Sequence, residues 1–451
     1  MICDILKIIN KVKNEERKII MKRKYIAIIS VILLHALLLP LLSACSKSGD
    51  GDASPETTEK PEPDDVSDTD KYKDIEKDYI KTDGAKFVNS SGDEFIIKGW
   101  GFYNGNSSTP NMTFNEDDYK TLSDIGFNAI RFYFGSAVFE TVPVNGATYR
   151  NLNQAAFDWI DRHVEWAKKY NMKIILNMHH SPGETDIGAR SLFTDSDRQD
   201  RFIAIWRAIA EYFKDEPAIL GFDIINEPNC GIAEGDTRPY TAAFDLYQFI
   251  VQRTINEIRE VNKNQIIIVE RLWISGAKNS RDNSSPNDQS DKWQNVNGKY
   301  NFPDITDDNY AYTYHIYEPR YVHQTAGGLD DGGNRVYPSS QVTKWDEKDP
   351  ETKKPWEMNK RFLEYAYTIP MDYIRNEKGV PFYIGELGIH VDNFEANSLG
   401  ENRGGRQWVL DLMEIFDKHK ISFSYHSYFI DEFHPVFNEK LEDAFRTAFG
   451  S

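Results

Sequence analysis

The sequence predicts a (β/α)8 barrel formed by one large domain, residues 76–451. Eight short runs of apolar, β-branched or aromatic residues alternate with longer stretches in which apolar residues recur at helical spacing. This alternation is typical of a parallel sheet covered by helices, and eight repeats suit a closed barrel. A doubly wound dinucleotide-binding fold is disfavoured because no glycine-rich phosphate loop follows the first strand.

The elements follow from these runs in chain order. The predicted strands are Phe95–Gly101, Phe127–Phe134, Lys173–His179, Ile219–Asn226, Gln265–Glu270, Tyr310–Tyr317, Pro381–Gly388 and Ser422–Tyr428. The predicted helices are Asn153–Tyr170, Asp197–Lys214, Thr241–Val261, Trp356–Asn376 and Arg406–Lys418. A polar stretch, Arg271–Asn309, and a glycine-rich stretch after the sixth strand are expected on the face where barrel loops build the working site.

The first 44 residues are predicted to be a signal peptide. From Met21, the expected true start, three basic residues precede an apolar run that ends in Ser43 and Ala44. The segment Leu42-Ser43-Ala44-Cys45 resembles a bacterial lipoprotein box, which implies that Cys45 is lipidated and becomes the mature N-terminus. The alternative is a plain transmembrane anchor, because about 18 apolar residues can span a bilayer.

Residues 45–75 are predicted to be a flexible, acidic linker that carries the lipid. Ser46 to Asp70 is rich in Ser, Pro, Thr, Asp and Glu, and cannot bury enough apolar surface to fold. We expect the protein in a bacterial cell envelope, attached to the membrane by the lipid alone. Ser46 after the cysteine favours the outer membrane.

Composition excludes several other classes of protein. A formal net charge of −18 disfavours a nucleic-acid partner. The three cysteines, Cys3, Cys45 and Cys230, cannot build a disulfide framework or a cysteine-rich zinc site. We expect Trp159, Trp166 and Trp206 in the core. Trp273, Trp293 and Trp345 fall in strand-end loops, where they are candidates for stacking on sugars.

Chemistry-bearing side chains gather at the predicted strand ends. They are Arg131, His179, Asn226, Glu227, His315, Tyr317 and Glu386. Barrel-strand ends converge on one point, so Glu227 and Glu386 can face each other across a site. Enzymes that cleave glycosidic bonds commonly use two carboxyl groups. One, in its protonated form, protonates the leaving oxygen, and the other, ionised, attacks the anomeric carbon. An arginine beside the second would keep its pKa low.

Residues from about Lys86 to Phe449 resemble glycoside hydrolase family 5, the cellulase-type retaining β-glycosidases. The matching segments, in chain order, are IRFYF, ILNMHHSPG, GFDIINEPN, YTYHIYEPRYVHQ and PFYIGELG. The resemblance implies a barrel that hydrolyses a β-glycan, with no cofactor and no metal. The segment Tyr317–Gln324 is similar to cellulase members, which favours an endo-β-1,4-glucanase, and we expect a monomer.

The resemblance also implies a role for each site residue. Glu227 is the general acid/base and Glu386 the nucleophile. Asn226 holds the sugar 2-hydroxyl, Arg131 and Tyr317 contact the nucleophile, and His179 and His315 complete the pocket. The sequence departs from the family at His426, where members usually place a tryptophan platform under the sugar.

Alternatives therefore stay open. His426 suits a glycan-binding lipoprotein that has lost turnover, or a relative specific for β-mannan or xyloglucan. A metal-dependent hydrolase could use His179, His180 and His315 with a carboxylate. Against it, His179 and His180 are expected to point to opposite faces of their strand.

Overall fold

The computed structural model describes residues 78–140, 152–183, 190–229, 240–272, 301–318, 336–343, 345, 348–389, 391–396, 399–428 and 439–451. The chain divides into two compact units, Met1–Ser67 and Asp68–Ser451, and the second contains every described residue. The predicted signal peptide, Cys45, the linker, Cys230, Trp273 and Trp293 lie outside the described residues. Among the described residues, no helix has the length and apolar character needed to cross a membrane.

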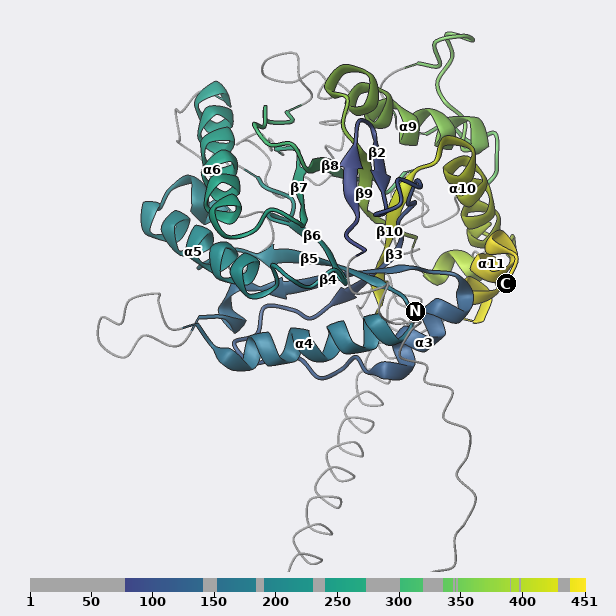
Figure 1. Ribbon diagram of the computed structural model, residues 1–451. Helices are drawn as coiled ribbons and strands as arrows, with labels where there is room; N and C mark the ends of the chain where they lie inside the picture. The colour runs from purple at the N-terminus through teal and green to yellow at the C-terminus, as the bar shows by residue number, and fades with distance from the viewer. Residues whose placement is uncertain are drawn as a thin grey trace, which may run out of the picture. The chain divides into compact units, whose positions relative to one another are not determined.

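The predicted (β/α)8 barrel is confirmed. Its strands are β3 (Lys98–Tyr103), β4 (Ala129–Gly135), β5 (Lys173–His180), β6 (Ile219–Asp223), β7 (Ile266–Glu270), β8 (Tyr310–His315), β9 (Phe382–Leu387) and β10 (Ser422–Tyr428). They form a closed parallel barrel in the order β10-β3-β4-β5-β6-β7-β8-β9 (Figure 1). All eight predicted strands exist, with ends that differ by a few residues.

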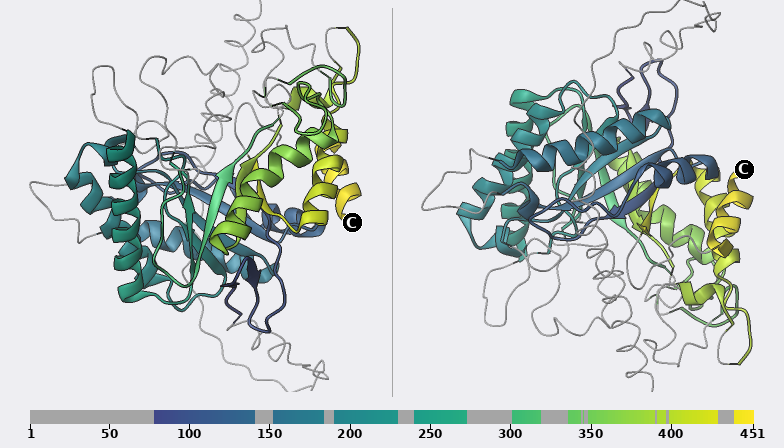
Figure 2. Two further views of the ribbon diagram at one scale, coloured as in Figure 1. Left: turned by 90° about the horizontal axis from the view of Figure 1, so that it is seen from above. Right: turned by 90° about the horizontal axis from the view of Figure 1, so that it is seen from below.

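Helices cover the outside of the barrel. They are α3 (Glu116–Ile125), α4 (Gln154–Lys169), α5 (Ser196–Tyr212), α6 (Tyr240–Val261), α9 (Lys360–Tyr373), α10 (Gly405–His419) and α11 (Glu439–Phe449). Helices α5 and α6 lie on the opposite side of the strands from α10 and α11 (Figure 2). Asn115, Asn153, Asp195 and Asn359 cap the starts of α3, α4, α5 and α9 by accepting backbone N–H groups.

The barrel separates two apolar cores. The larger lies between strands and helices and contains the outward-facing strand residues together with Trp159 and Trp206, as predicted for these tryptophans. The smaller fills the base of the barrel interior with Ala129, Ile175, Leu220, Ile266, Ile268, Ala311 and Tyr383. Because side chains alternate along a strand, the inward series started by Ala129 and Ile266 continues to Arg131 and Glu270 at the strands' carboxyl ends.

A short hairpin closes the base of the barrel. Strands β1 (Lys81–Asp83) and β2 (Lys86–Val88) pair antiparallel around a turn at Gly84, whose φ of 52° lies in the left-handed region that glycine tolerates. Ile80 and Phe87 join the small core and seal it from below.

One tryptophan prediction fails. Trp345 is half-buried and packs edge-on against Phe362 of α9, with ring centroids 5.6 Å apart, so it extends the outer core. This contact does not fit the predicted role as a sugar platform.

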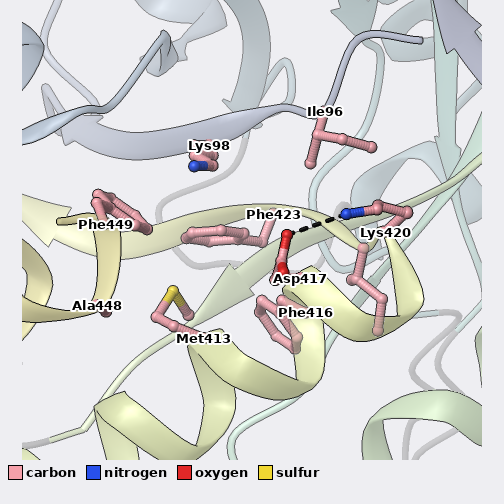
Figure 3. A pocket seen from close by; sticks show the side chains of 10 residues that line it. Ile96, Lys98, Met413, Phe416, Asp417, Lys420, Phe423, Ala448 and Phe449 are labelled. Atoms are coloured by element: carbon pink, nitrogen blue, oxygen red, sulfur yellow. Dashed lines mark hydrogen bonds and ion pairs between the residues drawn. The ribbon is translucent and has the colours of Figure 1, made fainter.

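A cavity of about 350 Å³ lies at the amino ends of β3 and β10 (Figure 3). Phe416, Phe423 and Phe449 line it, and Lys98 lies 4.5 Å from the Phe449 ring centroid. Lys420 at its edge pairs with Asp417 at 3.0 Å. The cavity is at the opposite end of the strands from the chemistry-bearing side chains.

Candidate active site

The carboxyl ends of the strands bring the predicted site residues together. Arg131 lies on β4, His179 on β5, His315 on β8, Glu386 on β9 and His426 on β10. Asn226 and Glu227 follow β6, and Tyr317 follows β8. The contacts below join all of these side chains into one cluster, although Arg131 and Glu386 are 255 residues apart in the chain.

The Glu386 carboxylate is held by two donors. Arg131 donates from Nη1 to Oε1 at 2.6 Å, and the Tyr317 hydroxyl donates to Oε2 at 2.7 Å. Arg131 is itself immobilised, because Nε donates to Asp223 at 2.8 Å and Nη2 donates to the Asn226 side-chain oxygen at 2.9 Å. Because all three guanidinium nitrogens of Arg131 donate hydrogen bonds, its orientation is fixed. Arg131 therefore orients the Glu386 carboxylate as well as binding it.

Glu386 is therefore ionised. Burial by itself raises the pKa of this carboxyl, but the positive charges of His315 and Arg131 outweigh burial and hold the pKa well below its usual range. An ionised carboxylate with both oxygens bound is suited to attack an electrophilic carbon.

Glu227 sits on a strained backbone. Its φ is 41°, in the left-handed region, which costs a non-glycine residue about 1–3 kcal/mol. Its backbone N–H donates to Oε2 of Glu270 at 2.7 Å. Its side chain is one-third exposed, and its Oε1 accepts from His315 Nδ1 at 2.9 Å. An oxygen of Glu227, a nitrogen of His315 and an oxygen of Glu386 all lie within 4.8 Å of one another.

His315 is a charged imidazole at the centre of three carboxylates. Its Nδ1 lies 3.5 Å from Glu386 Oε2, and its Nε2 lies 3.5 Å from Glu270 Oε2. Burial alone lowers the pKa of His315, but Glu270, Glu386 and the hydrogen bond with Glu227 raise it to about 9. The ring is thus protonated at neutral pH and donates to Glu227.

This raised pKa predicts a pH-dependent stability. The unfolded histidine titrates near 6.5, so the stabilisation is fully present below pH 6.5 and is lost as the pH rises through about 9. We expect the free energy of unfolding of the wild type to fall by up to about 3 kcal/mol more than that of His315→Gln between pH 6 and pH 9.5. Denaturant unfolding at both pH values measures this difference. Equal losses in the two proteins would mean that His315 is not charged in the folded state.

Three aromatic rings line the wall beside Glu386. The Tyr133 ring stacks on His179 with centroids 4.8 Å apart and 11° between planes. The Tyr133 ring also lies nearly parallel to His426, with centroids 5.7 Å apart and 18° between planes, and its hydroxyl lies 3.3 Å from His426 Nδ1. His426 Nδ1 lies 3.5 Å from Glu386 Oε2, so His426 belongs to the site despite departing from the family pattern. Burial lowers the pKa of both histidines, which are therefore neutral at neutral pH.

The expectation that His179 and His180 point to opposite faces is wrong. The pairing of β4 with β5 shifts register between Phe134 and Gly135, which inserts an extra residue in β5. The two rings lie 5.3 Å apart, and His180 Nε2 lies 3.3 Å from the Tyr103 hydroxyl.

The metal hypothesis fits the site poorly for a different reason. Among the described residues, Glu227, His315 and Glu386 offer the atoms close enough to share an ion. However, Arg131 lies 2.6 Å from Glu386 and His315 is protonated, so two positive charges already occupy the position. A further cation there would be repelled.

Sequence reasoning missed four residues of the site: Tyr133, Asn177, Asp223 and Glu270. Each is buried and lies at or near the carboxyl end of a barrel strand. Asp223 bonds Arg131, and Asn177 lies 3.1 Å from His179 Nδ1. The signal for Glu270 was present, because a charged residue ends the apolar run IIIVE, as Glu386 ends its own strand run.

Comparison with known proteins identifies the family of this chain. The family model "Cellulase (glycosyl hydrolase family 5)" matches residues 88–431. The chain belongs to glycosyl hydrolase family 5. This membership confirms the family named from the five motifs.

Individual relatives of this family 5 protein are distant. Endoglucanase C from Acetivibrio thermocellus is 29% identical over 214 residues, which cover 47% of this chain and 52% of that protein. An endoglucanase from Paenibacillus polymyxa is 26% identical over 261 residues, which cover 54% of this chain and 61% of that protein. The chain thus spans about half to three-fifths of the length of these relatives.

Solved structures share the family 5 fold. Endoglucanase Cel5A from Thermotoga maritima matches with a TM-score of 0.54 and 18% identity, over 77% of this chain and 96% of that one. The same enzyme in complex with mannotriose matches with a TM-score of 0.52 and 19% identity, over 78% of this chain and 97% of that one. At such identities the likeness concerns the fold alone.

Proposed function

We propose that this protein hydrolyses β-glycosidic bonds in a polysaccharide by a two-step retaining mechanism. The observation that carries the proposal is the closeness of Glu227 to Glu386, which is ionised and hydrogen-bonded at both oxygens. An oxygen of Glu227 and an oxygen of Glu386 lie within 4.8 Å of each other, and a nitrogen of His315 lies within the same distance of both. Retaining enzymes place their two carboxyl groups about 5–5.5 Å apart, whereas inverting enzymes leave room for a water and need about 6.5–9.5 Å.

In the first step, an oxygen of Glu386 attacks the anomeric carbon. The bond to the leaving oxygen breaks, and that oxygen takes the proton of the Glu227 carboxyl. In the second step, Glu227 removes a proton from water, which attacks the anomeric carbon and releases Glu386. Each step uses the proton left by the other, so the enzyme returns to its starting state and the anomeric configuration is retained.

We infer that the substrate is a β-1,4-glucan or a close relative, cut internally. The names of the relatives, two of which are endoglucanases, support this preference. The Thermotoga maritima enzyme has been crystallised with both cellobiose and mannotriose, so mannan remains a candidate on the same barrel. His426 gives the site an imidazole wall beside Glu386, which suits a hydrogen-bonded sugar.

A polysaccharide panel tests this function. Purified protein is incubated with β-1,4-glucan, xyloglucan, β-mannan and xylan, and the products are sized, with Glu386→Gln as the inactive control. We expect short oligosaccharides from glucan and an early fall in viscosity, which marks endo action. Release from mannan alone would contradict the glucan preference. Tight binding without release from any polymer would favour a binding protein instead.

We also propose that Cys45 carries a lipid that anchors the protein to the outer membrane of a bacterium. The support is the sequence alone: an apolar run closed by Ser43 and Ala44, followed by an acidic segment.

The expected effect of Cys45→Ala is release from the membrane. Without the thiol no thioether-linked lipid forms, so the protein should move from the membrane fraction to the soluble fraction of the cell envelope. Fractionation with immunodetection measures this, and Cys230→Ala is the matched control. Membrane association of Cys45→Ala equal to that of the wild type would favour the transmembrane-anchor alternative.

A further inference from the structure

A third carboxylate, Glu270, lies beneath the pair of glutamates. It ends β7, and its side chain is fully buried. Residues Ile266 and Ile268 of the same strand face the barrel interior, so the alternation of side chains directs Glu270 inward as well. The mechanism above assigns it no proton and no bond to substrate.

Glu270 contacts Glu227 directly through the backbone. Its Oε2 accepts the Glu227 N–H at 2.7 Å. A hydrogen bond from an amide to an ionised carboxylate is stronger than one between neutral groups. This hydrogen bond is made by Glu227, whose φ of 41° is unfavourable for a non-glycine residue. It therefore helps to keep the Glu227 backbone in this conformation.

Glu270 also reaches Glu227 through His315. Nε2 of His315 lies 3.5 Å from Glu270 Oε2 and, among the described residues, makes no hydrogen bond, while Nδ1 donates to Glu227 at 2.9 Å. The charged groups that face His315 are Glu227 after β6, Glu270 on β7, Glu386 on β9 and Arg131 on β4. Of the three carboxylates, Glu270 has no assigned part in bond breaking.

We propose that Glu270 is a positioning residue for Glu227, which it holds through two routes, the backbone amide and the charged imidazole of His315. The proposal rests on the proposed acid/base role of Glu227. Glu270 keeps the Glu227 carboxyl aimed at the leaving oxygen, and it keeps His315 able to donate to that carboxyl. Its loss should therefore slow the two proton transfers of Glu227 more than the attack of Glu386 on the anomeric carbon.

Two substitutions separate the routes. Glu270→Gln keeps an oxygen that accepts the Glu227 N–H but removes the charge opposite His315. Glu270→Ala removes both. Asp307→Asn is the matched control, because it removes another carboxylate with little exposure, one paired with Arg259 just before β8, at the amino end of the barrel.

The first measurement needs no activity. An NMR titration of the His315 ring, assigned by comparison with His315→Gln, should give a pKa of about 9 in the wild type and in Asp307→Asn. In Glu270→Gln and Glu270→Ala it should fall toward 6.5, the value of an unperturbed histidine. An unchanged titration in Glu270→Gln would overturn the second route.

The second measurement uses aryl β-cellobiosides with different leaving groups. With phenyl cellobioside, which needs a protonated leaving oxygen, kcat/KM, which reports the first step alone, should fall about 10-fold in Glu270→Gln and about 100-fold in Glu270→Ala. With 2,4-dinitrophenyl cellobioside, which needs little protonation, kcat/KM should stay within about 3-fold of wild type in both variants. Equal losses on both substrates would reduce Glu270 to a structural residue and overturn the proposal.

The two measurements also separate this proposal from the proposed function. If the wild type cleaves no glycan and no aryl glycoside, the hydrolase function fails, while the titration still decides whether Glu270 controls His315. If Glu270→Ala does not fold, as judged by circular dichroism, Glu270→Gln carries both measurements because it preserves shape.

Discussion

Glu386→Ala is expected to lower kcat for every substrate of this protein by a factor of about 10⁴ or more, since removing the proposed nucleophile eliminates the proposed covalent step. The substitution leaves Arg131 and Tyr317 without the carboxylate that they hold, but it leaves the apolar cores untouched. The measurement is kcat on aryl cellobioside and on polymer, with Glu364→Gln on α9 as a control of unchanged activity.

A chemical rescue makes this result specific. The space left by the Glu386 carboxylate admits a small anion, so sodium azide should attack the anomeric carbon of an activated β-glycoside from the opposite face. The product is an α-glycosyl azide, which NMR distinguishes from the β anomer. Activity of Glu386→Ala within about tenfold of wild type, or a β-azide product, would place the nucleophile elsewhere.

Glu227→Ala is expected to make the two steps of the reaction distinguishable in the kinetics. Without a general acid, kcat on substrates with poor leaving groups should fall by about 10²–10⁴-fold. A 2,4-dinitrophenyl glycoside leaves without protonation, so its first step should remain fast. The second step lacks its base, so the glycosyl-enzyme should accumulate. Stopped-flow absorbance should then show a burst of dinitrophenolate equal to the enzyme concentration, followed by slow turnover.

The same experiment defines the result that would contradict the proposed acid/base role of Glu227. Added azide needs no base to react with the glycosyl-enzyme, so it should accelerate the slow phase of Glu227→Ala and yield a β-glycosyl azide. A variant that loses the same factor on all leaving groups, without a burst, would mean that Glu227 is not the acid/base. The Asn226–Glu227 segment would then serve binding alone.

Much of the fold could be predicted from local patterns. Strands that are buried on both faces are apolar along most of their length. The segments IIIV in β7, IRFYF in β4 and FYIG in β9 can therefore each be recognised as a strand from their own residues. The elements missed include helix α3 between β3 and β4, the hairpin β1–β2 before the barrel, and helix α11 after it. Helix α3 begins with Glu116, Asp117 and Asp118 after the cap at Asn115, and hairpin β1–β2 turns at Gly84, so both had local signals.

The topology of the barrel allowed the grouping of the site residues to be predicted from the positions of the strands. Because parallel strands in a closed barrel all end on one rim, residues at strand ends such as Glu227 and Glu386 meet whatever their separation in sequence. The five motifs were therefore enough to name the family and to nominate the site residues. The lipid anchor at Cys45 and the monomeric state stay predictions, as do the roles of the individual residues.

The local pattern of residue types in this chain was sufficient to predict its family and its barrel and to nominate the pair of glutamates, because burial and strand direction follow from a few neighbouring residues. The protonation states needed distances between side chains on four strands. Whether His315 is charged depends on Glu270, Glu386 and Arg131 together, and electrostatic energy varies with each separation. The bulge before His180 and the left-handed backbone of Glu227 likewise arise from contacts across the barrel, so the support that Glu270 gives Glu227 appeared once the strands were closed.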